Sequence, residues 1–136
     1  MKKFILLVFF AFIALTLNAQ RILIYGGEDN EVFLGILNAP PSDSKSIWNE
    51  YSEYGNKYNS ESIWNAYGTY GSEYNSYCPW NEYSSSSPIL LDSSGNYYGK
   101  FNSSNSNDIV RKICELGTTI QKSDKDLDFW YELLFY

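Results

Sequence analysis

The stretch from Ser46 to Tyr83 constrains the fold of this chain most, because it repeats with a period of sixteen residues. It reads SIWNEYSEYGNKYNSE, then SIWNAYGTYGSEYNSY, then CPWNEY. Each copy carries a tryptophan, followed three residues later by a tyrosine: Trp48, Trp64 and Trp80, then Tyr51, Tyr67 and Tyr83. A fixed period means that one local structure is built repeatedly and that each copy buries its apolar face against its neighbours.

Each copy has the spacing of a short helical element. Tyrosines stand three, six and ten residues after the tryptophan, which places side chains on one face of a helix. Gly, Ser and Asn are too frequent for a helix of the whole copy. We therefore expect one or two helical turns per copy, with Ser46 and Ser62 as N-caps and Gly55 and Gly71 ending the turns. Pro79 suits the first helical position of the third copy.

The repeat aromatics have two interpretations. Large aromatic side chains can fill the core of a small domain that has few aliphatic residues. Alternatively, they form an exposed platform for sugars, peptides or another protein, because rigid aromatics dominate binding surfaces. Under the second interpretation the candidate ligand-binding residues are Trp48, Trp64, Trp80, Tyr51, Tyr67 and Tyr83.

The N-terminus, residues 1–19, has the pattern of a secretory signal peptide: a basic start, an apolar stretch and a small-residue cleavage site at Ala19. An uncleaved anchor is the alternative, but the apolar run is short for a membrane span. Cleavage predicts a single exported domain at residues 20–136, periplasmic or extracellular and without a transmembrane span. Loss of Lys2 and Lys3 moves the net charge from −6 to −8. This acidity argues against nucleic acid and anionic lipid as partners.

Two predicted hairpins flank the repeat region at 46–83. Residues 21–38 alternate around a Gly-rich turn, and residues 88–102 contain a strand, an Asp92-to-Asn96 turn and a returning strand. The returning strands align at an offset of sixty-four residues. We expect the hairpins to pair into one antiparallel sheet with the repeats packed across it, and Gly35 and Gly99 to mark bulges or close backbone approaches.

The C-terminal region predicts one or two helices. Residues 108–116 form an amphipathic pattern that Gly117 can end. Residues 123–126 then resemble a helix cap, followed by an apolar segment at helical spacing, for which a final strand is the alternative. The predicted fold class is therefore α+β, a small single domain of two antiparallel hairpins that flank an aromatic repeat of short helical turns, with one or two C-terminal helices.

Two cysteines in an exported chain, Cys78 and Cys114, predict one disulfide. A catalytic cysteine is the alternative, but the chain has no histidine to activate it. Asp124, Asp126 and Asp128 alternate as in a calcium loop, but the Gly and distal Glu of such a loop are missing. The Asp92-to-Asn96 turn also has oxygen ligands at loop-like spacing, which an ordinary hairpin turn explains. We expect no metal and no cofactor.

Carboxylates among the aromatics raise the possibility of a glycosidase, which uses two acidic residues beside a bound sugar. The candidates are Glu50, Glu53, Glu73 and Glu82. No pair is defined by spacing, and Glu50 and Glu82 occupy equivalent repeat positions where the second copy has Ala66. A repeated glutamate is more typical of a structural role, so we predict that the protein is not an enzyme.

The repeat stretch, followed by PILLDSSGNYYGKF, resembles a group of uncharacterised bacterial proteins, secreted or envelope-associated, with tandem SIxNxYGxYGSxYS units and a PPxIVDxxGNFYG stretch. The resemblance covers roughly residues 33–101, with Ser52 in place of the first motif Gly and Ser87 in place of the first Pro. It implies a shared fold and brings no activity or catalytic residue. The residues after Phe101 lie outside it.

These observations predict an exported, non-enzymatic module that binds envelope or glycan ligands through the repeat aromatics. The alternative is a structural or protein–protein interaction domain, in which the repeat aromatics form the core and the C-terminal aromatic segment contacts another exported protein. The sequence does not define an oligomeric state.

Overall fold

The computed structural model describes residues 20–136, so the predicted signal peptide lies outside the described residues. The elements follow in the order β1 (Leu23–Gly26), β2 (Val32–Ile36), β3 (Ile89–Leu91), β4 (Tyr97–Lys100), α2 (Asp108–Lys122) and α3 (Leu127–Phe135). The strands form one antiparallel sheet in the order β2-β1-β3-β4. The predicted α+β class and small single domain are confirmed.

The sheet consists of the two predicted hairpins, joined side by side. Ile24 of β1 lies opposite Gly35 of β2 on one side and Leu90 of β3 on the other. The register shifts beside Gly35 in the first hairpin and around Gly99 in the second, and these glycines have φ angles of 114° and 95°. Only glycine adopts such angles readily, so the predicted bulges are the positions at which both returning strands bend.

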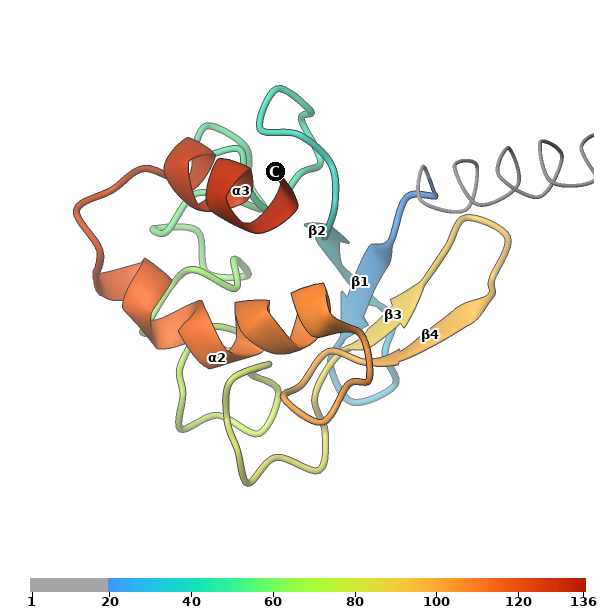
Figure 1. The fold of residues 1–136 in the computed structure, drawn as a ribbon. Helices are drawn as coiled ribbons and strands as arrows, with labels where there is room; N and C mark the ends of the chain where they lie inside the picture. Colours follow the sequence, from blue (N-terminus) through green and yellow to red (C-terminus); the bar gives the residue numbers. More distant parts are fainter. Residues whose placement is uncertain (1–19) are drawn as a thin grey trace, which may run out of the picture.

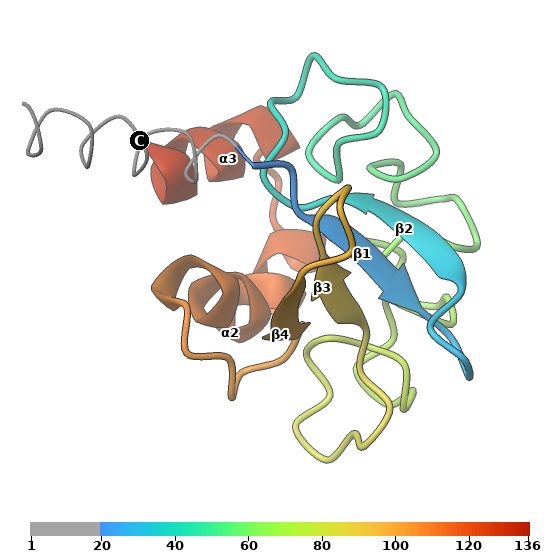
Figure 2. The same cartoon turned by 90° about the vertical axis from the view of Figure 1, so that its right-hand side faces the viewer.

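Helices and repeats lie on opposite sides of the core. Figure 1 shows α2 and α3 in front of the repeat segment, which curves from β2 round to β3, and Figure 2 shows the same helices beside the sheet after a 90° turn. One layer is thus helical, and the other consists of the sheet continued sideways by the repeats. The first copy joins the edge of β2 directly, since Ile36 N donates to Lys45 O and Ile47 N donates to Ile36 O. The core fills the space between the layers.

Helix α2 is longer than predicted. Asn107 caps its N-terminus by accepting from the backbone N–H groups of Ile109 and Val110, but the helix continues through Gly117 to Lys122. The predicted end at Gly117 is wrong, because this glycine serves packing. A Cβ atom there would lie 2.2 Å from the Trp80 ring, so the indole packs directly on the helix backbone.

Helix α3, rather than the alternative final strand, follows the predicted cap. The Asp126 carboxylate accepts from Phe129 N, and Glu50 Oε1 of the first repeat copy accepts from Leu127 N at 2.9 Å. The helix buries Leu127 and Tyr131 against the core. Glu50 therefore has a structural role, tying the repeat to the N-terminus of α3, where a negative charge is favourable.

Candidate functional site

The repeat folds as a chain of β-turns and not as the predicted helical turns. In most turns the backbone N–H of the fourth residue donates to the carbonyl of the first, and the fourth residue then begins the next turn. Steps of three, three, four, three and three residues make up the sixteen-residue period, at corners Ser46, Asn49, Ser52, Asn56, Asn59 and Ser62. The same steps recur from Ser62 to Cys78.

Polar side chains hold nearly every corner of this chain of turns. Asn49 Oδ1 accepts from Tyr51 N at 2.9 Å, and Asn65 Oδ1 accepts from Tyr67 N at 3.0 Å. Ser46 Oγ likewise accepts from Trp48 N. Asn and Ser favour such local side-chain bonds, which replace the backbone bonds of a helix. Asn65 Nδ2 also donates backwards to the Asn59 carbonyl, so consecutive turns are tied to one another.

The repeat tryptophans form a ladder inside the molecule. Trp48, Trp64 and Trp80 are 0%, 2% and 8% exposed, and their successive ring centroids are 5.3 and 5.4 Å apart. Each indole N–H donates to a backbone carbonyl, those of Leu37, Ile47 and Gly71 respectively. The structure therefore places the three indoles in the core, which is the first of the two interpretations of the sequence.

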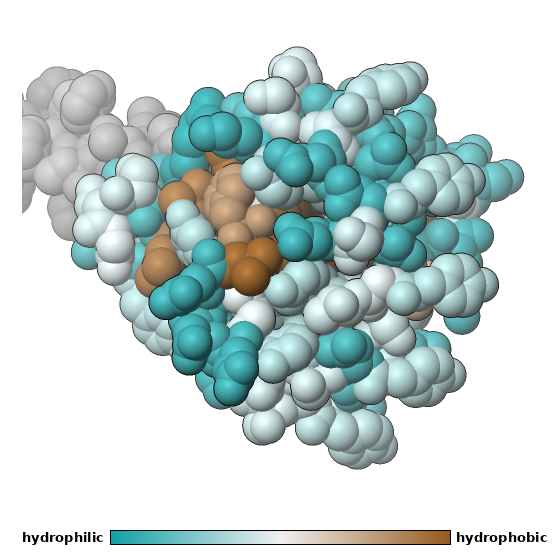
Figure 3. Space-filling model, turned by 180° about the vertical axis from the view of Figure 1, so that it is seen from behind, coloured by the Kyte–Doolittle hydropathy of each residue, from teal (hydrophilic) through white to brown (hydrophobic). Residues whose placement is uncertain are grey.

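The tyrosines that follow the tryptophans point into solvent. Tyr51, Tyr67 and Tyr83 are 97%, 98% and 93% exposed, and Tyr58 and Tyr74 are 82% and 88% exposed. We call these five residues the outer tyrosines. Rings of this kind stand away from the surface on the side of the repeats in Figure 3. Of the sequence-predicted ligand-binding residues, only the tyrosines thus reach the open surface.

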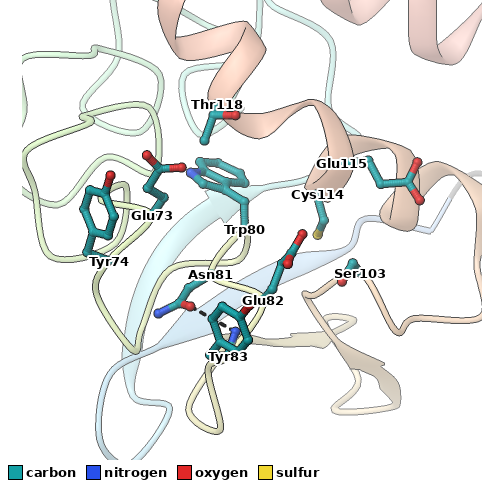
Figure 4. Close-up of a pocket in the computed structure, with 10 residues that line it drawn as sticks. All are labelled: Glu73, Tyr74, Trp80, Asn81, Glu82, Tyr83, Ser103, Cys114, Glu115 and Thr118. Atoms are coloured by element: carbon teal, nitrogen blue, oxygen red, sulfur yellow. Dashed lines mark hydrogen bonds between the residues drawn. The ribbon is translucent and has the colours of Figure 1, made fainter.

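A cavity of about 610 Å³ lies between the third copy and α2. Tyr74 and Tyr83 stand at its sides, and Figure 4 shows the side chains of Glu73 and Glu82 on two sides of Trp80. Glu115 of α2 also lines the cavity, with its carboxylate directed away from the other two in this view. None of the three glutamates forms an ion pair within residues 20–136. Glu73 and Glu82 are among the glutamates that the repeat singles out, whereas Glu115 is not, because its position on α2 bears no relation to the repeat period.

A second cavity, of about 330 Å³, occupies the corresponding place beside the first copy. It is lined by Tyr51, Tyr58 and Trp64, with Lys57 and Lys125 among its other residues. Tyr58 and Trp64 stand sixteen residues before Tyr74 and Trp80 of the first cavity. Glu50 also lines the second cavity, so the two cavities share an aromatic frame but carry opposite net charges.

The predicted disulfide is not formed. Cys78 and Cys114 are free thiols in the core. Cys78 takes the corner position of Ser46 and Ser62, where backbone N–H groups of Trp80 and Asn81 face its sulfur. Burial raises the pKa of Cys78 to about 12 and also raises the pKa of Cys114. Both groups are thus held as neutral thiols, which are poor nucleophiles.

The carboxylate of Asp92, in one of the two turns with calcium-like spacing, has hydrogen-bond partners within the protein. Asp92 Oδ1 accepts from the backbone N–H groups of Ser94 and Asn96, and Oδ2 accepts from Tyr98 Oη. The Asn96 side chain also donates to Asp92 Oδ2. This bond, followed by those from the backbone and from Tyr98, lowers the pKa of Asp92 to about 2. Among residues 20–136, no group of three or more acidic, Cys or His side chains is arranged to hold a metal ion.

Gln121 of α2 has a structural role that its sequence context does not indicate. Its Nε2 atom donates to the carbonyls of Ile63 and Gly71, at 3.0 and 2.7 Å. These bonds join residues fifty or more positions apart in the sequence.

In the part of the chain that the structure describes, no helix is long and apolar enough to span a membrane.

Comparisons with protein-family models, with curated proteins and with solved structures find no match to this chain.

Proposed function

We propose that the protein is an exported, non-enzymatic module that binds glycan of the cell envelope through the outer tyrosines. The observation that supports the proposal most directly is the exposure of these five rings on one repeated backbone structure. Tyrosine usually buries much of its ring and leaves only the hydroxyl in water. An exposed phenol presents a flat apolar face and a hydroxyl, and a sugar ring offers the complementary apolar face and hydroxyl groups.

The turns that carry the outer tyrosines favour binding because they are fixed before a ligand arrives. The backbone N–H groups of Tyr51, Tyr67 and Tyr83 are each bonded to the side chain of an asparagine. Ligand binding then orders only the side chains, and a pre-organised surface loses less free energy on association. Equivalent rings in successive copies also suit a polymer, since several weak contacts along one chain reinforce one another.

A second candidate function is protein–protein interaction through α3. Phe129, Leu133 and Tyr136 lie along this helix and remain exposed, while the repeat tryptophans supply the core. Exposed apolar side chains spaced along one helix are typical of a surface that another protein covers. This is the alternative that the sequence analysis raised.

Glycan-array binding and co-sedimentation with envelope preparations test the first proposal. The protein is compared with a variant carrying Tyr51→Ser, Tyr67→Ser and Tyr83→Ser, and with a matched variant carrying Phe129→Ser and Leu133→Ser on α3. We expect binding by the protein and by the α3 variant, and a loss of at least about tenfold in the tyrosine variant. Unchanged tryptophan fluorescence would show that each variant is folded.

Two results would contradict the proposal. A blank array together with no co-sedimentation would remove envelope glycan as the ligand. Binding that survives the loss of the tyrosines but not of Phe129 and Leu133 would favour the second candidate, in which α3 carries the contact.

A further inference from the structure

We infer that the 610 Å³ cavity beneath the third copy is a subsite for a sugar unit that carries a free, protonated amine. The inference rests on the proposed function and specifies one chemical feature of its glycan. It combines three observations: an aromatic frame, carboxylates without a cationic partner, and a related cavity of opposite charge.

The aromatic frame supplies faces on which a cation or a sugar ring can lie. Tyr74 and Tyr83 are outer tyrosines, so the cavity opens onto the surface proposed to bind glycan. Trp80 lies behind them, with its N–H group already bonded to the Gly71 carbonyl. Ammonium groups are attracted to the faces of such rings, most strongly where water is partly excluded. The volume lies within the range of ordinary small-ligand sites.

The carboxylates come from separate segments of the chain, which the fold brings to the lining of one cavity. Glu73 and Glu82 lie on different turns of the repeat, and Glu115 lies on α2. None has a Lys or Arg ion-pair partner within the described residues, so a ligand amine would not compete with a cation of the protein for these carboxylates. The amine would form charge-assisted hydrogen bonds with them.

The cavity beside the first copy is an internal comparison. Lys57 stands at the repeat position of Glu73, and Lys125 adds a second positive charge there. Tyr58 and Trp64 occupy the same places as Tyr74 and Trp80. The aromatic frame is therefore common to both cavities, whereas the charged lining differs: three glutamates in one, and two lysines with Glu50 in the other. An amine-bearing ligand would enter the acidic cavity and be repelled from the other.

The test compares two probes that differ only in their amines: oligomers of glucosamine and oligomers of N-acetylglucosamine of equal length. Calorimetry is done at about pH 5.5, well below the pKa of an amine, so that the glucosamine amines are protonated. We expect the glucosamine oligomer to bind about tenfold more tightly, with a preference that weakens as salt is added. Glu73→Gln with Glu82→Gln should remove the preference, while Lys57→Gln in the other cavity should not.

Each other outcome overturns the inference in a recognisable way. Equal binding of the two oligomers would leave glycan binding intact but would remove the amine subsite. Binding of neither oligomer would count against the proposed function as well. Equally tight binding of oligolysine would mean that the cavity recognises amines on peptides rather than on sugars. If the double variant fails to fold, Glu82→Gln alone, at an exposed position, and the salt dependence of the unaltered protein give the same test.

Discussion

The inner tryptophans and the outer tyrosines are built in the same way and end in opposite environments. Trp64 and Tyr67 each stand two residues after a corner residue whose side-chain oxygen accepts the aromatic residue's own backbone N–H. One ring is nevertheless in the core and the other in solvent. The corner bonds therefore fix where the backbone runs, and the packing of α2 and α3 against one side of the repeat decides which rings are buried.

A third set of aromatics completes the comparison. Tyr54 and Tyr70, six residues after their tryptophans, turn towards the sheet. The Tyr54 ring lies 5.0 Å from that of Phe33, and Tyr70 is buried beside Gly26. Each full copy thus directs one aromatic to the helices, one to the sheet and others to solvent. A core and an exposed aromatic surface are therefore produced by one short repeated sequence.

The largest effect is expected at the centre of the ladder. Trp64→Ala removes a ring that stacks on Trp80, packs at a tilt against Trp48 and donates to the Ile47 carbonyl. Loss of a buried tryptophan lowers the free energy of unfolding by about 3–5 kcal/mol. Urea denaturation followed by circular dichroism measures the change. A loss below 1 kcal/mol, on the order of a surface substitution, would contradict the assignment of the ladder to the core.

The next largest effect is expected where the ladder meets α2. Gly117→Ala places a methyl group about 2.2 Å from the Trp80 ring, so the helix and the third copy must separate. Overpacking of this kind lowers the free energy of unfolding by roughly 1–3 kcal/mol. Thr119→Ala, at an exposed position of the same helix, is the matched control. If both substitutions stabilise the protein through helix propensity alone, the close contact is not formed.

The corner bonds, which precede both the inner tryptophans and the outer tyrosines, should contribute less to the free energy of unfolding than the buried rings do. Asn65→Ala removes the acceptor for Tyr67 N and the donor to the Asn59 carbonyl. We expect a loss of about 1–2 kcal/mol in the free energy of unfolding, as for a helix cap. Asn65→Asp keeps the acceptor and loses only the donor, so denaturation should show an intermediate loss. Equal losses in the two variants would mean that the bond to Tyr67 N contributes nothing.

The sequence predicted the sheet better than the repeat. Alternation and turn residues gave both hairpins, and the sixty-four-residue offset gave the two bulges at Gly35 and Gly99. The repeat was misread because steps of three and four residues also describe one face of a helix. The distinguishing signal is local: a Ser or Asn stands two residues before almost every repeat aromatic, as a chain of side-chain-capped turns requires.

Local sequence patterns do not predict contacts between residues that are far apart in the chain. Gly117 was interpreted as a helix end, although its lack of a side chain serves the Trp80 ring more than thirty residues away. Glu115 and Gln121 stand on an amphipathic helix whose own sequence gives no sign of what faces it. The two cysteines suggested a disulfide, but Cys78 occupies a serine's corner position instead. The candidate cavity depends on these same long-range contacts.

The smallest effect on stability is expected at the outer tyrosines. Tyr67→Ser removes a ring that is 98% exposed and keeps the backbone N–H that Asn65 fixes, so the free energy of unfolding should change by no more than about 0.5 kcal/mol. The same substitution should weaken glycan binding, measured by calorimetry with an envelope glycan fragment. Tyr70→Ser is the matched control, because it removes a buried ring of the same copy and should reduce stability instead. A Tyr67→Ser variant as destabilised as Tyr70→Ser would mean that the outer rings pack against the protein, and the distinction between inner and outer aromatics would fail.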